Sequence, residues 1–140
     1  MAVITIDGVR VETADNANLL EAALQAGIYI PHLCHHPDLP ENGSCRMCIV
    51  EVEGQEGVTP SCTLRAKDGM VIHTKTERVN KLRTLALELL LAGHPEDCST
   101  CPKSGNCELQ TPIQYIGANN ARMRVRSKGI KLEERNPLLI

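Results

Sequence analysis

Large aromatic side chains are almost absent from this sequence of 140 residues, which contains two tyrosines, no phenylalanine and no tryptophan. Aromatic residues normally dominate the buried surface of a small protein. Hydrophobic residues nevertheless make up 42% of the chain, which is sufficient for a globular fold. We therefore expect an aliphatic core that is helped by bound inorganic groups.

Signals for export or membrane insertion are also lacking. The chain begins with a strand-like stretch where a signal peptide would carry a basic segment and an apolar run. No stretch reaches the roughly 18 apolar residues that a membrane span requires. The net charge of −2 argues against nucleic acid as a main partner. We expect a cytoplasmic protein without direct membrane insertion.

The sequence contains no Gly-x-Gly-x-x-Gly motif, no P-loop and no arrangement typical of a Ser/His/Asp triad. The first two motifs cradle the phosphates of nucleotides and flavins, and the third carries nucleophilic catalysis. We therefore do not expect a complete active site in this chain.

Four cysteines in the first half have the spacing C-x10-C-x2-C-x13-C; they are Cys34, Cys45, Cys48 and Cys62. Without a secretion signal, seven cysteines in the whole chain favour metal or redox chemistry over disulfides. Soft thiolates select iron–sulfur clusters, zinc or copper(I). The plant-type two-iron pattern, C-x4-C-x2-C…C, shares the inner pair and the distant fourth cysteine. A [2Fe-2S] cluster is favoured, and structural zinc is the alternative, disfavoured by the long first gap.

A second set of candidate ligands follows as H-x3-C-x2-C-x5-C; its members are His94, Cys98, Cys101 and Cys107. A four-iron cluster takes four ligands, and imidazole can replace thiolate at iron. Three cysteines and one histidine are also a normal structural zinc site. The spacing alone leaves both possibilities open.

Several other residues near the first cysteines invite a hypothesis. Gly43, just before Cys45, is expected to allow a close backbone approach. Arg46 either brings positive charge toward a cluster or faces solvent. The histidines beside Cys34 are expected to be exposed loop side chains; they are His32, His35 and His36.

Periodicity predicts an α+β fold. Two alternating stretches, 3–6 and 9–12, are joined by Asp7-Gly8, a hairpin signal. A helix is expected to begin after Asn18 and to end at Gly27. Further strands are predicted at 49–53, 59–62 and 70–74. This order is compatible with a β-grasp, a mixed sheet crossed by one helix.

The second half is predicted to be helical, with a long helix over 77–92 and a short one within 108–116. One face of the long helix is formed by Val79, Leu82, Ala86 and Leu89. We expect this helix to be buried within the chain or covered by a partner subunit. The basic stretch 121–135 is interpreted as a solvated strand, with docking to an acidic partner as the alternative.

Together these runs resemble the N-terminal region of the large iron–sulfur subunit of NADH:quinone oxidoreductase (complex I). That region is shared with [FeFe]-hydrogenases and with NAD-linked hydrogenases and formate dehydrogenases. The matching runs are Ile30–Cys34, Gly43–Glu51, Pro60–Cys62, Asp68–Val71 and His94–Gln110.

The resemblance implies a β-grasp [2Fe-2S] ferredoxin domain at 1–75 and a small helical and loop [4Fe-4S] domain at 76–140. It assigns the [2Fe-2S] cluster to the first cysteine set and the [4Fe-4S] cluster, with one histidine ligand, to the second set. It implies electron transfer between a flavin or NAD(H) unit and the terminal site of a quinone reductase, hydrogenase or formate dehydrogenase.

The same resemblance implies that the partners are other subunits of a redox complex, among them a flavin- and NAD-binding iron–sulfur subunit. It also implies that any association with a membrane occurs through these partner subunits. The alternatives are a zinc-stabilised interaction module and a freely diffusing ferredoxin. Members of the family usually continue beyond a segment like the last residues of this chain, so a fragment of a longer polypeptide is favoured over a small stand-alone subunit.

Overall fold

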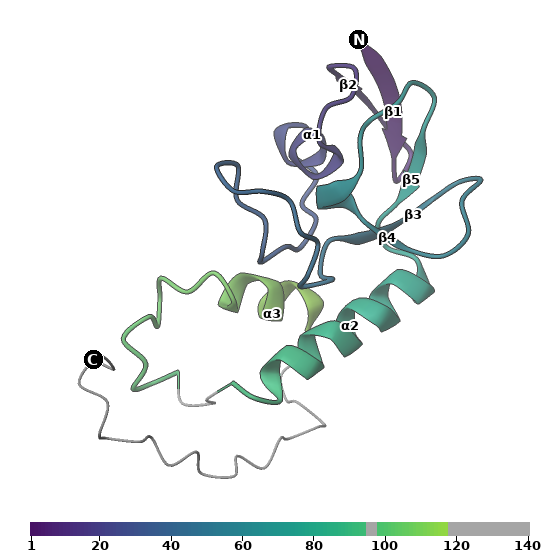
Figure 1. The fold of residues 1–140 in the computed structure, drawn as a ribbon. Helices are drawn as coiled ribbons and strands as arrows, with labels where there is room; N and C mark the ends of the chain where they lie inside the picture. The colour runs from purple at the N-terminus through teal and green to yellow at the C-terminus, as the bar shows by residue number, and fades with distance from the viewer. Residues whose placement is uncertain (95–97, 118–140) are drawn as a thin grey trace.

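The protein is described here by a computed structural model that covers residues 1–94 and 98–117. A sheet and one short helix form the first part, and two helices follow it (Figure 1). In chain order the elements are β1 (Ala2–Ile6), β2 (Val9–Thr13), α1 (Leu19–Gln25), β3 (Ile49–Val52), β4 (Thr59–Pro60), the 3-10 turn η1 (Ser61–Thr63), β5 (Val71–His73), α2 (Glu77–Leu91) and α3 (Gln110–Ile116). The predicted basic strand at 121–135 lies outside the described residues.

The five strands form one mixed sheet in the order β2-β1-β5-β3-β4. β1 and β5 run parallel, with Thr5 opposite Val71, and the other neighbours are antiparallel. Helix α1 packs its buried leucines onto the sheet in one aliphatic core, together with Ile4 and Ile6. The predicted β-grasp and the α+β class are confirmed.

Short-range signals explain where the first elements begin and end. Asp7 and Gly8 both have positive φ, 48° and 84°, as a type I′ hairpin turn requires. The side chain of Asn18 accepts a hydrogen bond from the backbone N–H of Glu21 at 3.2 Å and so caps α1. Gly27 follows the C-cap with φ 76°. These three predictions are correct.

The inward-facing side chains of α2 share only Val79 with the apolar face of Val79, Leu82, Ala86 and Leu89. The helix begins at the predicted cap, Thr76, whose hydroxyl accepts from the N–H of Val79 at 3.1 Å. Leu82 and Leu89, however, are 38% and 58% exposed. The side chains that turn inward are Val79, Arg83, Leu87 and Glu88. A charged residue, Arg83, occupies the central buried position, and cover of the exposed leucines by a partner subunit stays a prediction.

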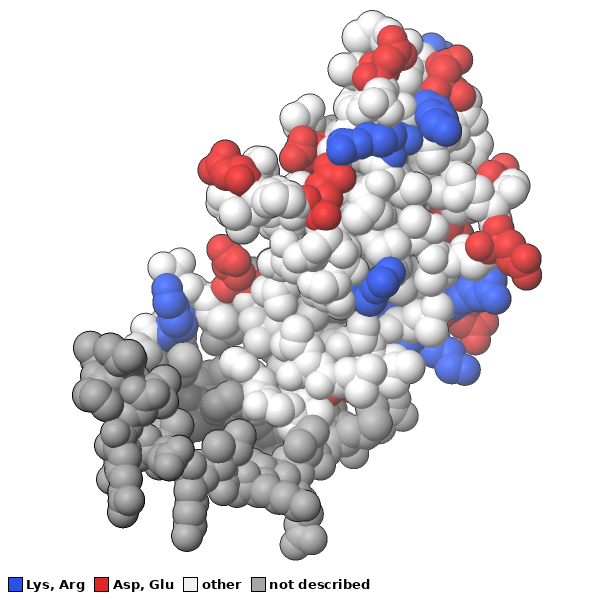
Figure 2. Space-filling model, viewed as in Figure 1, with Lys and Arg blue, Asp and Glu red and all other residues white. Residues whose placement is uncertain are grey.

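Helix α3 packs against α2, and the two helices adjoin the sheet domain around Met47 (Figure 1). Met47, Leu87 and Leu109 form a second, smaller apolar cluster. In Figure 2 acidic and basic side chains are interspersed on the visible face, so no charge of one sign dominates it. Within 1–94 and 98–117, no helix has the length and apolar character needed to cross a membrane.

Candidate metal centres

The structure brings the four cysteines of the first set to one end of the sheet domain. Cys34 and Cys45 are half-buried and lie on the long loop between α1 and β3. Cys48 directly precedes β3, and Cys62 lies in η1 rather than in the predicted strand. Both are only 1% exposed and belong to the main core. Two of the candidate ligands are thus fixed by the core, and the other two come from the loop.

The four thiols lie close enough to influence one another's ionisation. Burial, together with the thiols of Cys48, Cys34 and Cys45, raises the pKa of Cys62 to about 12. Burial also raises the pKa of Cys45. At Cys34 burial opposes ionisation, but hydrogen bonds from Cys45 and Ser44 outweigh it and lower the pKa. Bound cations would remove the repulsion among four such thiolates, which fits a metal cluster.

A backbone N–H already points at one sulfur of this set. The N–H of Cys45 lies 3.5 Å from Sγ of Cys34. Hydrogen bonds of this kind to ligand sulfurs tune the potential of iron–sulfur clusters. The donor set and its surroundings therefore fit the group that the spacing predicts.

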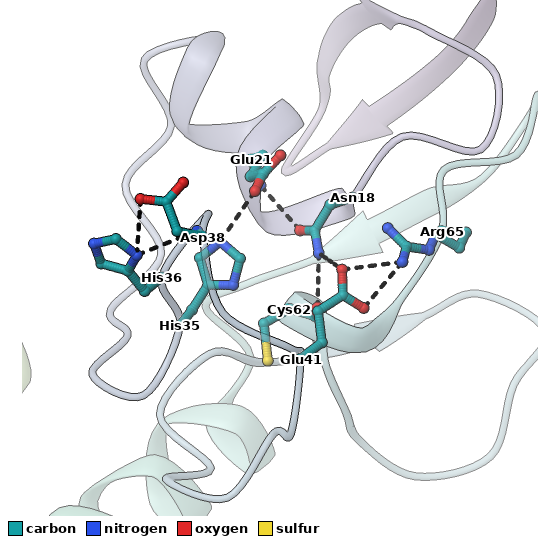
Figure 3. Close-up of polar contacts among 8 residues, drawn as sticks. All are labelled: Asn18, Glu21, His35, His36, Asp38, Glu41, Cys62 and Arg65. Carbon is teal, nitrogen blue, oxygen red and sulfur yellow. Dashed lines mark hydrogen bonds and ion pairs between the residues drawn. The ribbon is translucent and has the colours of Figure 1, made fainter.

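Asn18 ties the N-terminus of α1 to the last cysteine of the set. Its Nδ2 donates to the carbonyl oxygen of Cys62 and to Oε1 of Glu41, each at 2.7 Å (Figure 3). Glu41, on the long loop, also pairs with Arg65 at 3.0 Å. One amide therefore holds a helix cap, the η1 turn and the long loop together.

The long loop passes close to η1 at Gly43. This residue has φ 61°, and a Cβ built on it would lie 3.2 Å from Cγ2 of Thr63 and 3.4 Å from Cγ of Pro60. Gly43 thus approaches the side chains of Thr63 and Pro60 closely, whereas its predicted approach to the cluster sulfurs stays a prediction. Arg46, between the two close cysteines, has φ 57° and is exposed, so the solvent-facing alternative for its side chain is correct.

Arg83 is a residue of the site that periodicity did not identify. Its Nε donates to the carbonyl oxygen of Met47 and its Nη2 to that of Ile49, both at 2.8 Å. These two residues flank Cys48 in the sequence. The side chain comes from α2, so the helix of the second half contacts the ligand loop of the first.

The histidines near Cys34 differ in their surroundings. The side chain of His35 is only 7% exposed, and its Nε2 lies 3.2 Å from Oε1 of Glu21 (Figure 3). The two groups are in contact, but Nε2 of His35 has no hydrogen-bond partner among the described residues. The predicted exposure was wrong for His35 because α1 covers the start of the loop. His32 is half-buried, with Nδ1 2.8 Å from the carbonyl oxygen of Ile30, and His36 is exposed.

The second ligand set lies after α2, at the surface. His94, Cys98 and Cys101 are exposed, and Cys107 is half-buried just before α3. Residues 95–97 are outside the described part of the chain. The amide N–H of Gln110 bonds to the carbonyl oxygen of Cys107 at 3.2 Å, which anchors the last cysteine to the start of α3. The convergence of these four side chains stays a prediction.

The two sets adjoin one apolar cluster. Cys45 of the first set and Cys107 of the second both pack against the cluster of Met47, Leu87 and Leu109. Among residues 1–94 and 98–117, no three His, Cys, Asp or Glu side chains form a site for a single metal ion. Ligands of a two-iron cluster bind two separate irons, so they need not surround one point.

Two family models match the chain in succession. Residues 1–77 match the 2Fe-2S iron-sulfur cluster binding domain. Residues 83–122 match the NADH-ubiquinone oxidoreductase-G iron-sulfur binding region. The order of the two matches is that of the two ligand sets.

Similar proteins include a subunit of the NADH-quinone oxidoreductase of Rickettsia typhi, which is 38% identical over 99% of this chain and 21% of that protein. The 75 kDa subunit of the NADH-ubiquinone oxidoreductase of Reclinomonas americana is also 38% identical, over 99% of this chain and 20% of that protein. The chain thus spans about a fifth of the length of these curated relatives.

A solved structure of similar fold is the NAD+-reducing [NiFe]-hydrogenase in the H2-reduced state. It is 37% identical, with a TM-score of 0.79, and the match covers 88% of this chain and 52% of that chain. The chain therefore belongs to the family of 2Fe-2S iron–sulfur cluster binding domains, and it joins such a domain to a [4Fe-4S] binding region of the NADH-ubiquinone oxidoreductase-G type.

Proposed function

We propose that this chain is an electron-relay module of a larger NAD(H)-linked oxidoreductase. In this proposal, Cys34, Cys45, Cys48 and Cys62 bind the [2Fe-2S] cluster, and His94, Cys98, Cys101 and Cys107 bind the [4Fe-4S] cluster. The clusters supply one-electron transfer when bound. The protein supplies their spacing, burial and hydrogen bonds.

The observation that carries this proposal is the shared apolar cluster. Met47 lies between two cysteines of the first set, and Leu109 follows Cys107 by two residues. Because Met47 and Leu109 pack in one cluster with Leu87, the loops that carry the two ligand sets are neighbours. Two redox centres whose loops meet at one apolar cluster can exchange electrons, whereas two separate structural zinc sites have no need of such an arrangement.

We propose a boundary between the two units at residues 75 and 76. β5 ends at His73 and α2 begins at Glu77, so the division falls in the short connection between them. The cap of α2, Thr76, belongs to the second unit. Residues 1–75 then form the [2Fe-2S] domain and 76–140 the [4Fe-4S] domain.

The exposed leucines of α2 favour a subunit or part of a larger protein over a freely diffusing carrier. Leu82, Leu85 and Leu89 are 38%, 41% and 58% exposed and follow one another at helical spacing. Apolar patches of this kind tend to mark interfaces. We propose that the neighbours include a flavin- and NAD-binding iron–sulfur subunit, and that the electrons go on to a quinone reductase, hydrogenase or formate dehydrogenase site.

The test is low-temperature EPR combined with iron and sulfide analysis on anaerobically purified, dithionite-reduced protein. We expect about six irons per chain, two from the first set and four from the second. One signal should persist to higher temperature and the other should appear only near liquid-helium temperature. Cys48→Ser should remove only the first signal and Cys101→Ser only the second, so each variant controls for the other. A colourless, EPR-silent protein with two zinc ions would reject electron transfer.

A further inference from the structure

We propose that Arg83 of α2 is a positioning residue that fixes the loop of Cys48 and raises the reduction potential of the [2Fe-2S] cluster. The inference rests on the proposed assignment of Cys34, Cys45, Cys48 and Cys62 as ligands. Arg83 itself binds no metal in this proposal, and it lies in the other half of the chain.

The contact geometry is that of a clamp on one ligand. The two carbonyl oxygens that Arg83 binds belong to the residues immediately before and after Cys48, each at a distance of 2.8 Å. The planar guanidinium presents several N–H donors in a rigid fork, which suits two acceptors at a fixed separation. The clamp therefore restricts the backbone on both sides of one sulfur ligand.

The burial of Arg83 indicates a role beyond packing. The residue is 1% exposed and stands between Val79 and Leu87 on the inward face of α2. Burying a cation is costly unless it is compensated, and an apolar residue often stabilises such a position equally well or better. An arginine at the centre of an apolar stripe is thus unexpected for packing alone. Its position beside Cys48 offers the compensation, because a cluster held by thiolates is anionic.

The electrostatic surroundings agree with this arrangement. Burial lowers the pKa of Arg83, while Tyr115, Cys48, Asp7 and Tyr29 each act to raise it. Cys48 is the proposed cluster ligand among these groups. An arginine in a protein remains charged at neutral pH, so the site holds a fixed positive charge within electrostatic reach of a ligand sulfur.

The sign of the effect on the potential follows from this charge. Reduction of the cluster adds one negative charge, and a nearby cation favours the more negative state. In a buried site this interaction is screened less than it would be in water. Hydrogen bonding and net charge around a cluster are recognised determinants of its potential. Arg83 is therefore expected to make the cluster easier to reduce.

The experiment is an EPR-monitored redox titration of the higher-temperature [2Fe-2S] signal in the full chain. The variants are Arg83→Gln and Arg83→Lys, and iron content is measured on each. We expect Arg83→Gln to shift the midpoint potential to a more negative value. Arg83→Lys keeps the charge but cannot reproduce the fork, so its potential should lie nearer to that of the unmodified protein.

Two control variants separate charge from packing. Arg78→Gln removes a positive charge from the same helix at a site 61% exposed, where Nη1 is 3.7 Å from Glu51. Leu87→Ala loosens the contact of α2 with Met47 without a change in charge. Both should leave the potential close to its original value. A shift in Leu87→Ala equal to that in Arg83→Gln would overturn the inference, as would an unchanged potential in Arg83→Gln.

The remaining outcomes are also decisive. If Arg83→Gln retains no cluster, Arg83→Lys becomes the deciding variant. If Arg83→Lys retains the signal at nearly the original potential, the inference is supported. If Arg83→Lys also loses the cluster, Arg83 has only a structural role and the inference is overturned. Absence of any two-iron signal in the unmodified protein would instead reject the ligand assignment and with it the proposed function.

Discussion

Tyr29 and Tyr115, the two aromatic residues that the sequence contains besides its histidines, contact each other edge to face. Their ring centroids are 5.0 Å apart and the planes are inclined by 69°. Tyr29 follows α1 in the first half of the chain, and Tyr115 lies in α3. The pair therefore joins the sheet domain to the last described helix, close to Arg83.

We predict a measurable coupling between the two tyrosines. Edge-to-face aromatic pairs stabilise a protein by about 0.5–1.5 kcal/mol in addition to the stabilisation from the surface they bury. Because Tyr115 is 41% exposed, we expect this pair to contribute toward the lower end of that range. A double-mutant cycle with Tyr29→Leu and Tyr115→Leu, followed by anaerobic urea unfolding, should give a coupling energy of roughly 0.5 kcal/mol. A cycle of Tyr29→Leu with Leu89→Ala serves as the control and should be additive. Additivity of the two tyrosine variants would contradict the prediction.

Asn18→Asp is predicted to weaken retention of the first cluster although it preserves the helix cap. The carboxylate can still accept from the N–H of Glu21, but it cannot donate to the carbonyl oxygen of Cys62, which Nδ2 of Asn18 reaches at 2.7 Å. The new carboxylate would also repel the carboxylate of Glu41, whose Oε1 lies 2.7 Å from Nδ2 of Asn18. Loss of one buried hydrogen bond costs about 1–3 kcal/mol.

Iron release to a chelator measures this effect, and we expect it to be several-fold faster in Asn18→Asp than in the unmodified protein. Thr76→Asp makes the same kind of cap substitution at α2, away from the cysteines, and should leave the rate unchanged. Equal rates in both variants would show that Asn18 acts only as a helix cap.

Gly43→Ala is predicted to destabilise the long loop for two separable reasons. An alanine at φ 61° is strained by about 1–2 kcal/mol. Its Cβ would also meet Cγ2 of Thr63 at 3.2 Å. Gly54→Ala is a matched control, since Gly54 has φ 80° but no atom within 4 Å of the added Cβ. We expect urea unfolding to show a larger loss for Gly43→Ala than for Gly54→Ala.

A second substitution tests the close approach directly. Thr63→Ser removes Cγ2 and keeps the hydroxyl that donates to the carbonyl oxygen of Pro60 at 3.0 Å. In the background of Gly43→Ala it should recover part of the lost stability. No recovery would mean that backbone strain alone explains the loss.

Features governed by neighbours in the sequence could be predicted, and those that depend on distant segments could not. The Asp7-Gly8 turn, the Asn18 cap and the positive φ of Gly27 each depend on a few adjacent residues, and each was found. The eight candidate ligands follow from the chemistry of thiolate and imidazole in close spacing, and their role stays a prediction. The spacing of these residues in the sequence does not determine their positions in space. Cys62, for example, lies in a 3-10 turn where the sequence predicts a strand.

Arg83 shows why part of the site was missed. Hydropathy assigns an arginine to solvent, and the predicted stripe accordingly avoided it. Its acceptors are 36 and 34 residues away in the sequence and come within reach only after α2 packs on the β3 end of the sheet domain. The sequence does contain a weak indication of this position. Val79, Arg83 and Leu87 are spaced by four residues, which places the arginine on the same helix face as two apolar residues.

Retention of the first cluster is also predicted to depend on pH through Cys62. Burial and the three neighbouring thiols raise the pKa of this thiol to about 12 in the cluster-free fold. That fold therefore holds the proton more tightly than the unfolded chain does. The proton stabilises the cluster-free fold at low and neutral pH, and this stabilisation is lost as the pH rises toward about 12.

A thiol must give up its proton to serve as a ligand, so cluster release at neutral pH is accompanied by proton uptake at Cys62. Cys62 alone should therefore make the equilibrium for cluster release about tenfold more favourable for each unit by which the pH falls. Cys45, whose pKa burial also raises, acts in the same direction. Hydrogen bonds from Cys45 and Ser44 lower the pKa of Cys34, so this thiol adds to the pH dependence only below that lowered pKa.

Anaerobic competition with an iron chelator, followed by the [2Fe-2S] absorbance between about pH 6.5 and pH 8.5, measures this dependence. We expect retention to rise with pH across the whole range. His73→Gln removes an imidazole that pairs with Glu53 at 2.9 Å, on strand β5, and should leave the slope unchanged. Retention independent of pH would mean that Cys62 is already ionised before the cluster binds, and that the four thiols are less crowded than their arrangement indicates.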